Sequence, residues 1–256
     1  MKLSENYGVS WKCRKEVNMK SFCRLLIILF SFAFISCAKK TYCVGDIVMT
    51  DGRVLAAAEL EAYRGKAEPV AVIFSVTGGE HEESKRVLGL GLKVSEPLVF
   101  AAENSKGYGL SFKENYSLVA AQEFQIETGR YSNAGFYGLV DGRNTWRNVA
   151  KYDSKAKKSF AEYPAYEYAV NYGRNNNFKK FEKGWYLPTA AEARMLALSS
   201  ESGIAGMVTL PDFIWTSSQS YDAKENELVV NLISGSVETG FKDMDYSVCS
   251  IYCFAE

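Results

Sequence analysis

Histidine is nearly absent from this chain of 256 residues, which contains only His81. A Ser/His/Asp or Cys/His catalytic system would therefore have a single candidate base. That base lies in the charged stretch GGEHEESKR, which is typical of a solvated loop. Excess charge of one sign is also missing, because 30 basic residues balance 30 acidic ones. The sequence thus disfavours histidine-based catalysis, and no net field draws the protein to nucleic acid.

Motifs for metals and cofactors are missing as well. No cysteine or histidine pairs have the spacing of a zinc site, and no phosphate-binding loop is visible. Gly89 and Gly91 lack the remaining glycine of a dinucleotide loop. Asp243 and Asp245 share one side of an extended loop, but the rest of a calcium ligand set is absent. We therefore expect no metal and no cofactor.

The apolar run near the N-terminus is too short to span a membrane. It covers residues 25–35, whereas a spanning helix needs about 20 apolar residues. Lys20 and Arg24 precede the run and Ser36-Cys37 follow it, which is the pattern of a secretory signal. Residues 1–18 precede Met19, the start of an ordinary signal, and we interpret them as a mis-called start. The predicted signal sequence is therefore 1–36.

The end of this signal resembles a bacterial lipobox, with Phe34 where leucine is usual. The resemblance implies cleavage before Cys37 and a diacylglyceryl thioether on its sulfur. Residues 37–42 would then be a lipidated tether that anchors the protein to a membrane of the bacterial envelope. The alternative is a plain signal peptide with an incidental cysteine.

Three cysteines would remain after lipidation, namely Cys43, Cys249 and Cys253. Disulfides can form outside the cytoplasm. Cys249 and Cys253 lie in a segment that alternates like a strand, so their Cα atoms would be roughly 13 Å apart, too far for a bridge. A disulfide between Cys43 and either Cys249 or Cys253 is the pairing that geometry still allows. It would join the two ends of the domain. Cys249 and Cys253 could instead form a redox site, although buried inert thiols are commoner on a strand face.

Strand signals recur along the chain. Asp51-Gly52 suits a tight hairpin turn between two apolar segments, and residues 69–79 form a β-branched and aromatic run that predicts a buried strand. Residues 103–160 are rich in Gly, Asn, Ser and Lys and predict loops with short strands. Further extended segments are expected at 87–102 and in PDFIWTSSQ, ELVVNLISG and YSVCSIYCF.

Two helices are expected in the second half. Pro164 can take the first helical position of the first, the apolar stripe follows helical spacing, and Gly173 suits the position just after its end. The second begins after Pro188, where Thr189 and Glu192 stand at capping-box spacing. The expected class is α+β.

The loops that join the last strands are candidates for a contact surface. SSQSYDAKENE and GSVETGFKDMDY mix Tyr and Phe with Asp, Asn, Lys and Ser. Such mixtures make good binding surfaces at modest entropy cost. The alternative is a pair of ordinary solvated hairpin loops.

Several segments occur in an order that resembles a known family. YPAYEYAVNYG, GWYLPTAAEARML, IWTSSQ and VCSIYCF together resemble treponemal surface lipoproteins with a C-type-lectin-like fold, a group that includes variable proteins diversified by retroelements. The LPTxxE core is also similar to a turn in the formylglycine-generating, sulfatase-modifying enzymes, which share the fold. The resemblance implies one C-type-lectin-like domain at 43–256, matched best over 160–256. Its strands would be mostly short and antiparallel, with the N- and C-terminal strands close together.

For function, the resemblance implies a lipid-anchored domain, exposed on the outer surface of the cell, whose last loops bind a protein or glycan ligand. The residues that it assigns to ligand binding are Tyr221, Asp222, Lys224, Asn226, Phe241, Lys242, Asp243, Asp245 and Tyr246. The Trp-Asn-Asp calcium signature of sugar-binding lectins is absent, which disfavours calcium-dependent glycan binding. A non-enzymatic binding module is the leading hypothesis.

Two alternatives stay open. The first is a cysteine-dependent oxidase resembling the formylglycine-generating enzymes, acting through Cys249 and Cys253, although the cysteine spacing and the missing arginines depart from that family. The second is a structural envelope lipoprotein without a specific ligand.

Overall fold

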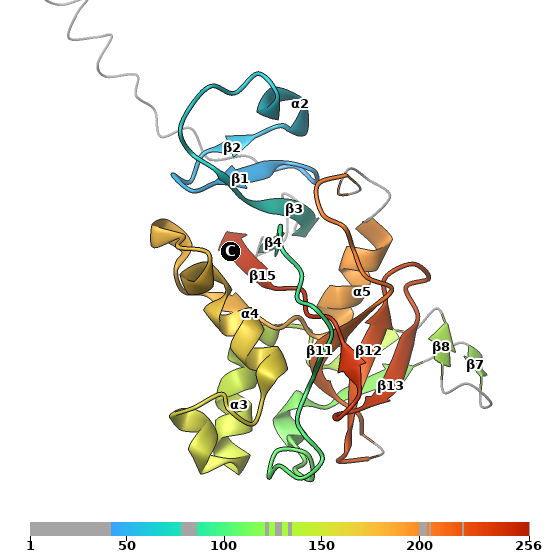
Figure 1. The fold of residues 1–256 in the computed structure, drawn as a ribbon. Coiled ribbons are helices and arrows are strands. Elements are labelled where there is room, and N and C mark those ends of the chain that lie inside the picture. The colour runs from blue at the N-terminus through green and yellow to red at the C-terminus, as the bar shows by residue number, and fades with distance from the viewer. Residues whose placement is uncertain are drawn as a thin grey trace, which may run out of the picture. The chain divides into compact units, whose positions relative to one another are not determined.

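The computed structural model describes residues 42–77, 86–120, 123–125, 130–132, 135–199, 204, 206–221 and 223–255. All of them belong to one compact unit, Tyr42–Glu256 (Figure 1). The predicted signal sequence, the predicted lipid site Cys37 and the histidine His81 lie outside the described residues.

A six-stranded antiparallel sheet contains both ends of this unit. In spatial order it consists of β10 (Trp185–Tyr186), β15 (Ile251–Ala255), β4 (Arg86–Gly91), β3 (Pro69–Thr77), β1 (Ile47–Met49) and β2 (Val54–Leu55). The hairpin β1–β2 confirms the predicted turn, in which Gly52 has a φ of 85° that favours glycine. The predicted buried strand is also confirmed, since β3 is enclosed along most of its length.

A second sheet has five strands and includes the last loops. Its order is β11 (Phe213–Gln219), β12 (Asn226–Asn231), β13 (Val237–Phe241), β8 (Arg130–Ser132) and β7 (Glu123–Gln125). Two smaller antiparallel pairs join β14 (Asp245–Tyr246) to β5 (Leu98–Val99) and β6 (Ser117–Ala120) to β9 (Gly135–Gly138). Strand β13 corrects the sequence interpretation, which placed these residues in a loop. Alternation along it is weak, since its central residues Glu238 and Thr239 are only half-buried.

Both predicted helices are present, as α4 (Pro164–Asn175) and α5 (Ala190–Ser199). Gly173 lies inside α4 rather than after its end. A Cβ at this position would meet the Phe181 carbonyl oxygen at 2.0 Å, so the glycine permits close packing. It does not terminate the helix as predicted.

The prediction of two helices is incomplete. The structure also contains a short helix, α2 (Ala57–Leu60), and a longer one, α3 (Thr145–Tyr152). The 3-10 turns are η1 (Lys113–Asn115), η2 (Gly142–Asn144), η3 (Ser154–Lys157) and η4 (Lys179–Phe181). Helix α3 lies in a stretch predicted to form loops and short strands. It fully buries only Thr145 and Val149, while Trp146, Ala150 and Tyr152 pack partly buried against the core. The helix is short and its residues are mostly polar, which hid its apolar face in the sequence.

The turn before α5 contains the predicted capping box. Glu192 N donates to Thr189 Oγ1 at 3.2 Å, and Thr189 N donates to Glu192 Oε2 at 3.0 Å. The turn is also bonded to β11, because Ser217 N donates to the Pro188 carbonyl at 2.7 Å and Ala190 N to Ser218 Oγ at 3.0 Å. These bonds join residues 188–190 to residues 217–218 of β11.

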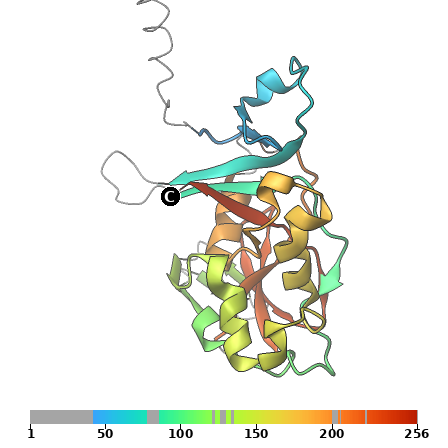
Figure 2. The same ribbon diagram turned by 90° about the vertical axis from the view of Figure 1, so that its left-hand side faces the viewer.

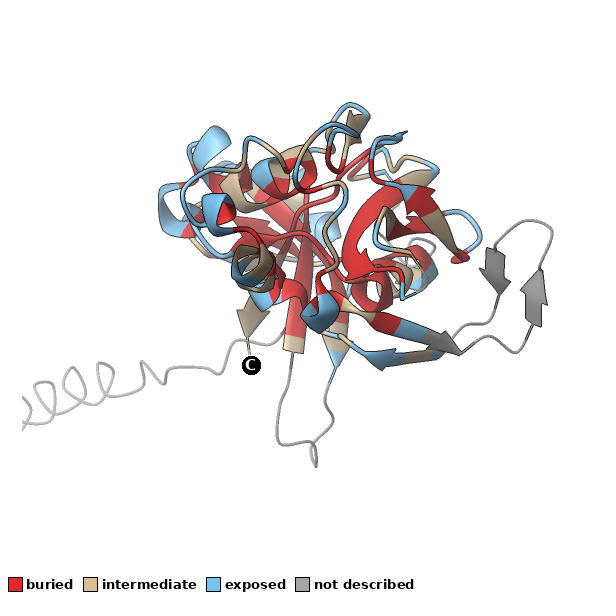
Figure 3. Cartoon of the chain, turned by 90° about the horizontal axis from the view of Figure 1, so that it is seen from below, coloured by how far each residue is buried: buried red, intermediate tan, exposed pale blue. Residues whose placement is uncertain are grey.

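Helix α5 packs against strands of both large sheets, β3 on one side and β11 and β12 on the other. Helices α3 and α4 lie together on another side of β11–β13 (Figures 1 and 2). Buried residues run through the strands between these helices (Figure 3). The predicted mixed class, with few helices and mostly antiparallel strands, is thus confirmed.

Candidate functional site

The two loops predicted to bind ligand meet at one end of the β12–β13 hairpin. Asn226 pairs with Phe241 in the strand register, and Lys242 N donates to the Glu225 carbonyl at 2.9 Å. Tyr221 is 63% exposed and Phe241 54% exposed. We use the name hairpin surface for the exposed predicted residues, which are Tyr221, Lys224, Phe241, Asp243 and Asp245.

The prediction that Lys242 belongs to this surface is wrong. Its side chain is fully buried, and Nζ donates to the Leu110 carbonyl at 2.8 Å and contacts the Gly107 carbonyl at 3.4 Å. Successive side chains at the end of a strand point in opposite directions, so an exposed Phe241 places Lys242 inside. The apolar side chain is outside and the charged one inside, the reverse of the usual distribution.

Two further predicted residues are only partly accessible. The Tyr246 ring is half-buried and meets the Trp215 ring edge-on at 4.9 Å, so much of it belongs to the core. Asn226 is half-buried at the start of β12, and its Oδ1 has no hydrogen-bond partner among the described residues. Asp222 lies outside the described residues.

A third segment, residues 101–116, supports the hairpin surface and was missed from the sequence. Gln219 is fully buried and connects this segment to the loop before β12. Its Nε2 donates to the carbonyls of Leu110 at 3.3 Å and Lys224 at 3.1 Å. Its Oε1 accepts from Phe112 N at 2.5 Å. The Tyr116 ring lies edge-on to Tyr221 at 5.5 Å. No local pattern signals the contacts of this segment with Gln219 and Tyr221, because they join positions about a hundred residues apart.

Beneath the hairpin surface, Lys242 faces Glu227 with Nζ and Oε1 3.8 Å apart. Both side chains are enclosed, and the Glu227 oxygens have no hydrogen-bond partner among the described residues. Burial raises the pKa of Glu227 to about 8 and lowers the pKa of Lys242 to about 8. Lys242 Nζ also lies 4.5 Å from the centre of the Phe112 ring. The pair is enclosed, so it can support the surface but does not present charge on it.

The predicted disulfide between Cys43 and Cys249 or Cys253 is not formed, and all three thiols are free. Cys43 is exposed in a turn, whereas its neighbour Tyr42 is buried with its ring 6.5 Å from the Phe254 ring. The two ends of the unit are therefore in contact through aromatic rings. Cys43 N donates to Asp46 Oδ2 at 2.8 Å, which holds Cys43 in the turn with its side chain exposed and away from this contact.

The thiol of Cys249 lies in the hydrophobic core, and burial raises its pKa to about 12. It therefore stays protonated at neutral pH, and a protonated thiol is a weak nucleophile. Cys253 is half-buried and its Sγ contacts the Ala255 carbonyl at 3.3 Å. The geometry offers little support for thiol chemistry at Cys249.

No cluster of three or more His, Cys, Asp or Glu suited to a metal ion occurs among the residues that the structure describes. In the same part of the chain, no helix combines the length and the apolar character needed to cross a membrane.

No protein-family model matches the chain, and no curated protein matches it in sequence. The fold is similar to that of a fimbrial protein from Bacteroides ovatus ATCC 8483, known from a crystal structure, with a TM-score of 0.50 and 15% sequence identity. The similarity covers 82% of this chain and 48% of the other, so this chain spans about half the length of the fimbrial protein. At this identity the similarity concerns the fold alone.

Proposed function

We propose that this protein is a lipid-anchored bacterial surface protein whose C-type-lectin-like domain binds a protein or glycan partner without catalysing a reaction. The hairpin surface carries the proposal, because it exposes two large aromatic rings, Tyr221 and Phe241, beside charged side chains. Rings of this kind supply contact area at low conformational cost.

The frame under the hairpin surface supports a binding role. Gln219 and Lys242 are fully buried and bond the two loops to residues 107–112. A surface held in one conformation before it meets a partner loses less entropy on binding.

Two observations support a location on the cell surface. The N-terminal sequence has the pattern of a signal that ends at a lipidated cysteine, Cys37. The fold is similar to that of a fimbrial protein. The C-type-lectin-like assignment rests on the motif order given above and on the mixed, mostly antiparallel architecture.

The proposal is tested with the full-length lipoprotein in detergent, applied to a glycan array and to a panel of immobilised extracellular-matrix proteins. We expect retention on at least one of them. The double variant Tyr221→Ala/Phe241→Ala should bind at least tenfold more weakly.

Ile233→Ala is the matched control, because Ile233 is 76% exposed in the turn at the other end of the same hairpin. It should bind like the wild type. Equal binding by the double variant, or equal loss in the control, would place the contact surface elsewhere. Absence of binding to every probe would favour the structural envelope role.

A further inference from the structure

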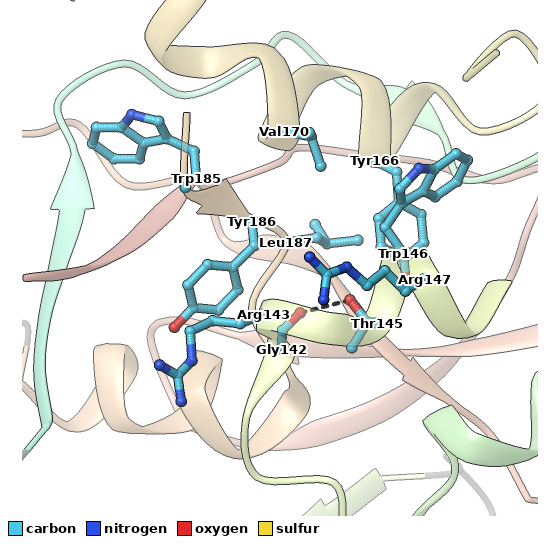
Figure 4. A pocket seen from close by; sticks show the side chains of 11 residues that line it. Gly142, Arg143, Thr145, Trp146, Arg147, Tyr166, Val170, Trp185, Tyr186 and Leu187 are labelled. Atoms are coloured by element: carbon cyan, nitrogen blue, oxygen red, sulfur yellow. Dashed lines mark hydrogen bonds between the residues drawn. The ribbon is translucent and has the colours of Figure 1, made fainter. Parts of the chain in front are cut away.

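A cavity of about 270 Å³ lies between α3, α4 and the segment around β10, and it shares no residue with the hairpin surface. Figure 4 shows the Arg147 side chain extending across it toward Leu187, whereas the Arg143 side chain turns away. Its lining includes Arg143, Trp146, Arg147, Val170, Tyr186 and Leu187.

The walls of the cavity are fixed by contacts behind them. Tyr186 donates its hydroxyl hydrogen to Glu192 Oε1 at 3.0 Å, and Gly142 N donates to Glu192 Oε2 at 3.1 Å. Trp146 stacks on Phe160 with ring centres 4.4 Å apart. Glu192 therefore acts beyond its capping box, because it also holds one aromatic wall in place. A cavity with fixed walls is suited to selective binding.

The charge on the lining is positive. It contains two arginines, and none of the described lining residues is an aspartate or glutamate. Arg143 is paired with Asp141, to which its Nε donates at 2.9 Å. Arg147 donates to the neutral Asn144 Oδ1 at 3.3 Å and has no carboxylate within ion-pair distance among the described residues. Arg147 is exposed, so its guanidinium is open to an anion that enters the cavity from solvent.

We propose that this cavity binds a small ring that carries a carboxylate, such as a uronic acid unit of a glycan. The planar guanidinium of Arg147 matches a carboxylate through two parallel hydrogen bonds. The rings of Trp146 and Tyr186 present apolar walls, and the negative face of an aromatic ring attracts the C–H groups of a sugar. Carboxylate and sugar ring are thereby recognised by different walls.

The size of the cavity agrees with one ring. Its volume of about 270 Å³ lies just below the range of about 300–1,000 Å³ that is typical of drug-sized ligands, as a smaller, single-ring ligand requires. The inference depends on this geometry and not on the proposed role of the hairpin surface.

The site is tested with the full-length lipoprotein in detergent by ligand-observed NMR, using methyl β-D-glucuronide and the neutral methyl β-D-glucoside. We expect the glucuronide to bind at least tenfold more tightly. Arg147→Ala should weaken glucuronide binding at least tenfold. Val170→Phe should weaken it similarly without changing charge, because the larger side chain fills the cavity.

Lys151→Ala is the control, since it removes a positive charge from the same helix at an exposed position outside the cavity. It should bind the glucuronide like the wild type, as should Tyr221→Ala/Phe241→Ala. Circular dichroism melting checks that each variant is folded. The inference is overturned if the wild type does not bind the glucuronide, if both sugars bind equally, or if folded Arg147→Ala binds normally.

Discussion

Two titratable residues, Glu227 and Lys242, are enclosed beneath the hairpin surface, and burial keeps Glu227 protonated up to a pKa of about 8. A buried ion pair loses hydration on both sides, and its attraction often offsets only part of that loss. Lys242 also donates to the Leu110 carbonyl, which joins the hairpin to residues 101–116. We therefore interpret the pair as a means of ordering the loops more than as a source of stability.

The pair predicts strongly non-additive substitutions. Lys242→Met should lower the free energy of unfolding by about 3 kcal/mol, because it leaves the buried Glu227 without its partner. Glu227→Gln should cost less near neutral pH, because Glu227 is protonated there and glutamine replaces a neutral group. The double variant should lose much less than the sum of the two. Urea unfolding of the four proteins measures this coupling, and additive losses would contradict the interpretation.

The same pair predicts a pH dependence between pH 5 and 7. The pKa of Glu227 is raised from 4.5 to about 8, so in this range the folded protein keeps a proton that the unfolded chain has lost. Lys242 stays mostly protonated in both states there, since its pKa is lowered only to about 8. Stability should therefore fall as pH rises, by up to about 1 kcal/mol per pH unit.

The reference protein is the Glu227→Gln/Lys242→Met variant, which lacks both groups. Its unfolding free energy, measured at matched pH values, should show a smaller decline. Parallel curves for the two proteins would mean that Glu227 does not titrate as described.

At the scale of elements, the turn before α5 connects three parts of the fold. Glu192 caps the helix, accepts from Arg86 Nη2 at 2.6 Å and also holds the Tyr186 hydroxyl. Arg86 lies in β4 and Tyr186 in β10, so one carboxylate links the helix to the six-stranded sheet.

Substitutions in this turn should differ in size. Thr189→Ala removes one cap acceptor and should lower the free energy of unfolding by about 1 kcal/mol. Glu192→Gln leaves the Arg86 charge without its closest partner and should cost about 3 kcal/mol. Chemical denaturation ranks the two variants.

Ligand affinity of stably folded Thr189→Ala should equal that of the wild type, because the hairpin surface does not contain this turn. A large loss of affinity in that variant would mean that the binding site had been placed wrongly.

Local signals in the sequence predicted several elements. Asp51-Gly52 specified its turn, and Thr189 with Glu192 specified the start of α5, because the residues involved are neighbours in the chain. Burial of Lys242 could not be predicted in this way. It depends on carbonyl groups more than 130 residues away, and the hydrophobicity rule favours burial of Phe241 instead.

At the scale of the whole molecule, the predicted N-terminal signal and the proposed binding domain would have separate roles. The structure describes the domain, and its fold is similar to about half of a fimbrial protein. The anchor remains a prediction from the sequence around Cys37. A lipid at that position would hold the domain at a membrane through residues 37–42.

Lipidation is predicted at one sulfur. Cells that express the protein should incorporate radiolabelled palmitate into it, and Cys37→Ser should abolish the incorporation because no thioether can form. Cys43→Ser is the matched control and should keep the label. Label in the Cys37→Ser protein would contradict the lipobox prediction.

The most direct test of the central claim is site-specific photo-cross-linking of the intact lipoprotein. Benzoylphenylalanine replaces Tyr221, Phe241 or Ile233, and each protein is irradiated with the glycan or matrix protein that the wild type retains. We predict covalent adducts from positions 221 and 241 and none above background from 233. Adducts at 233 alone, or equal yields at all three positions, would contradict binding through the hairpin surface.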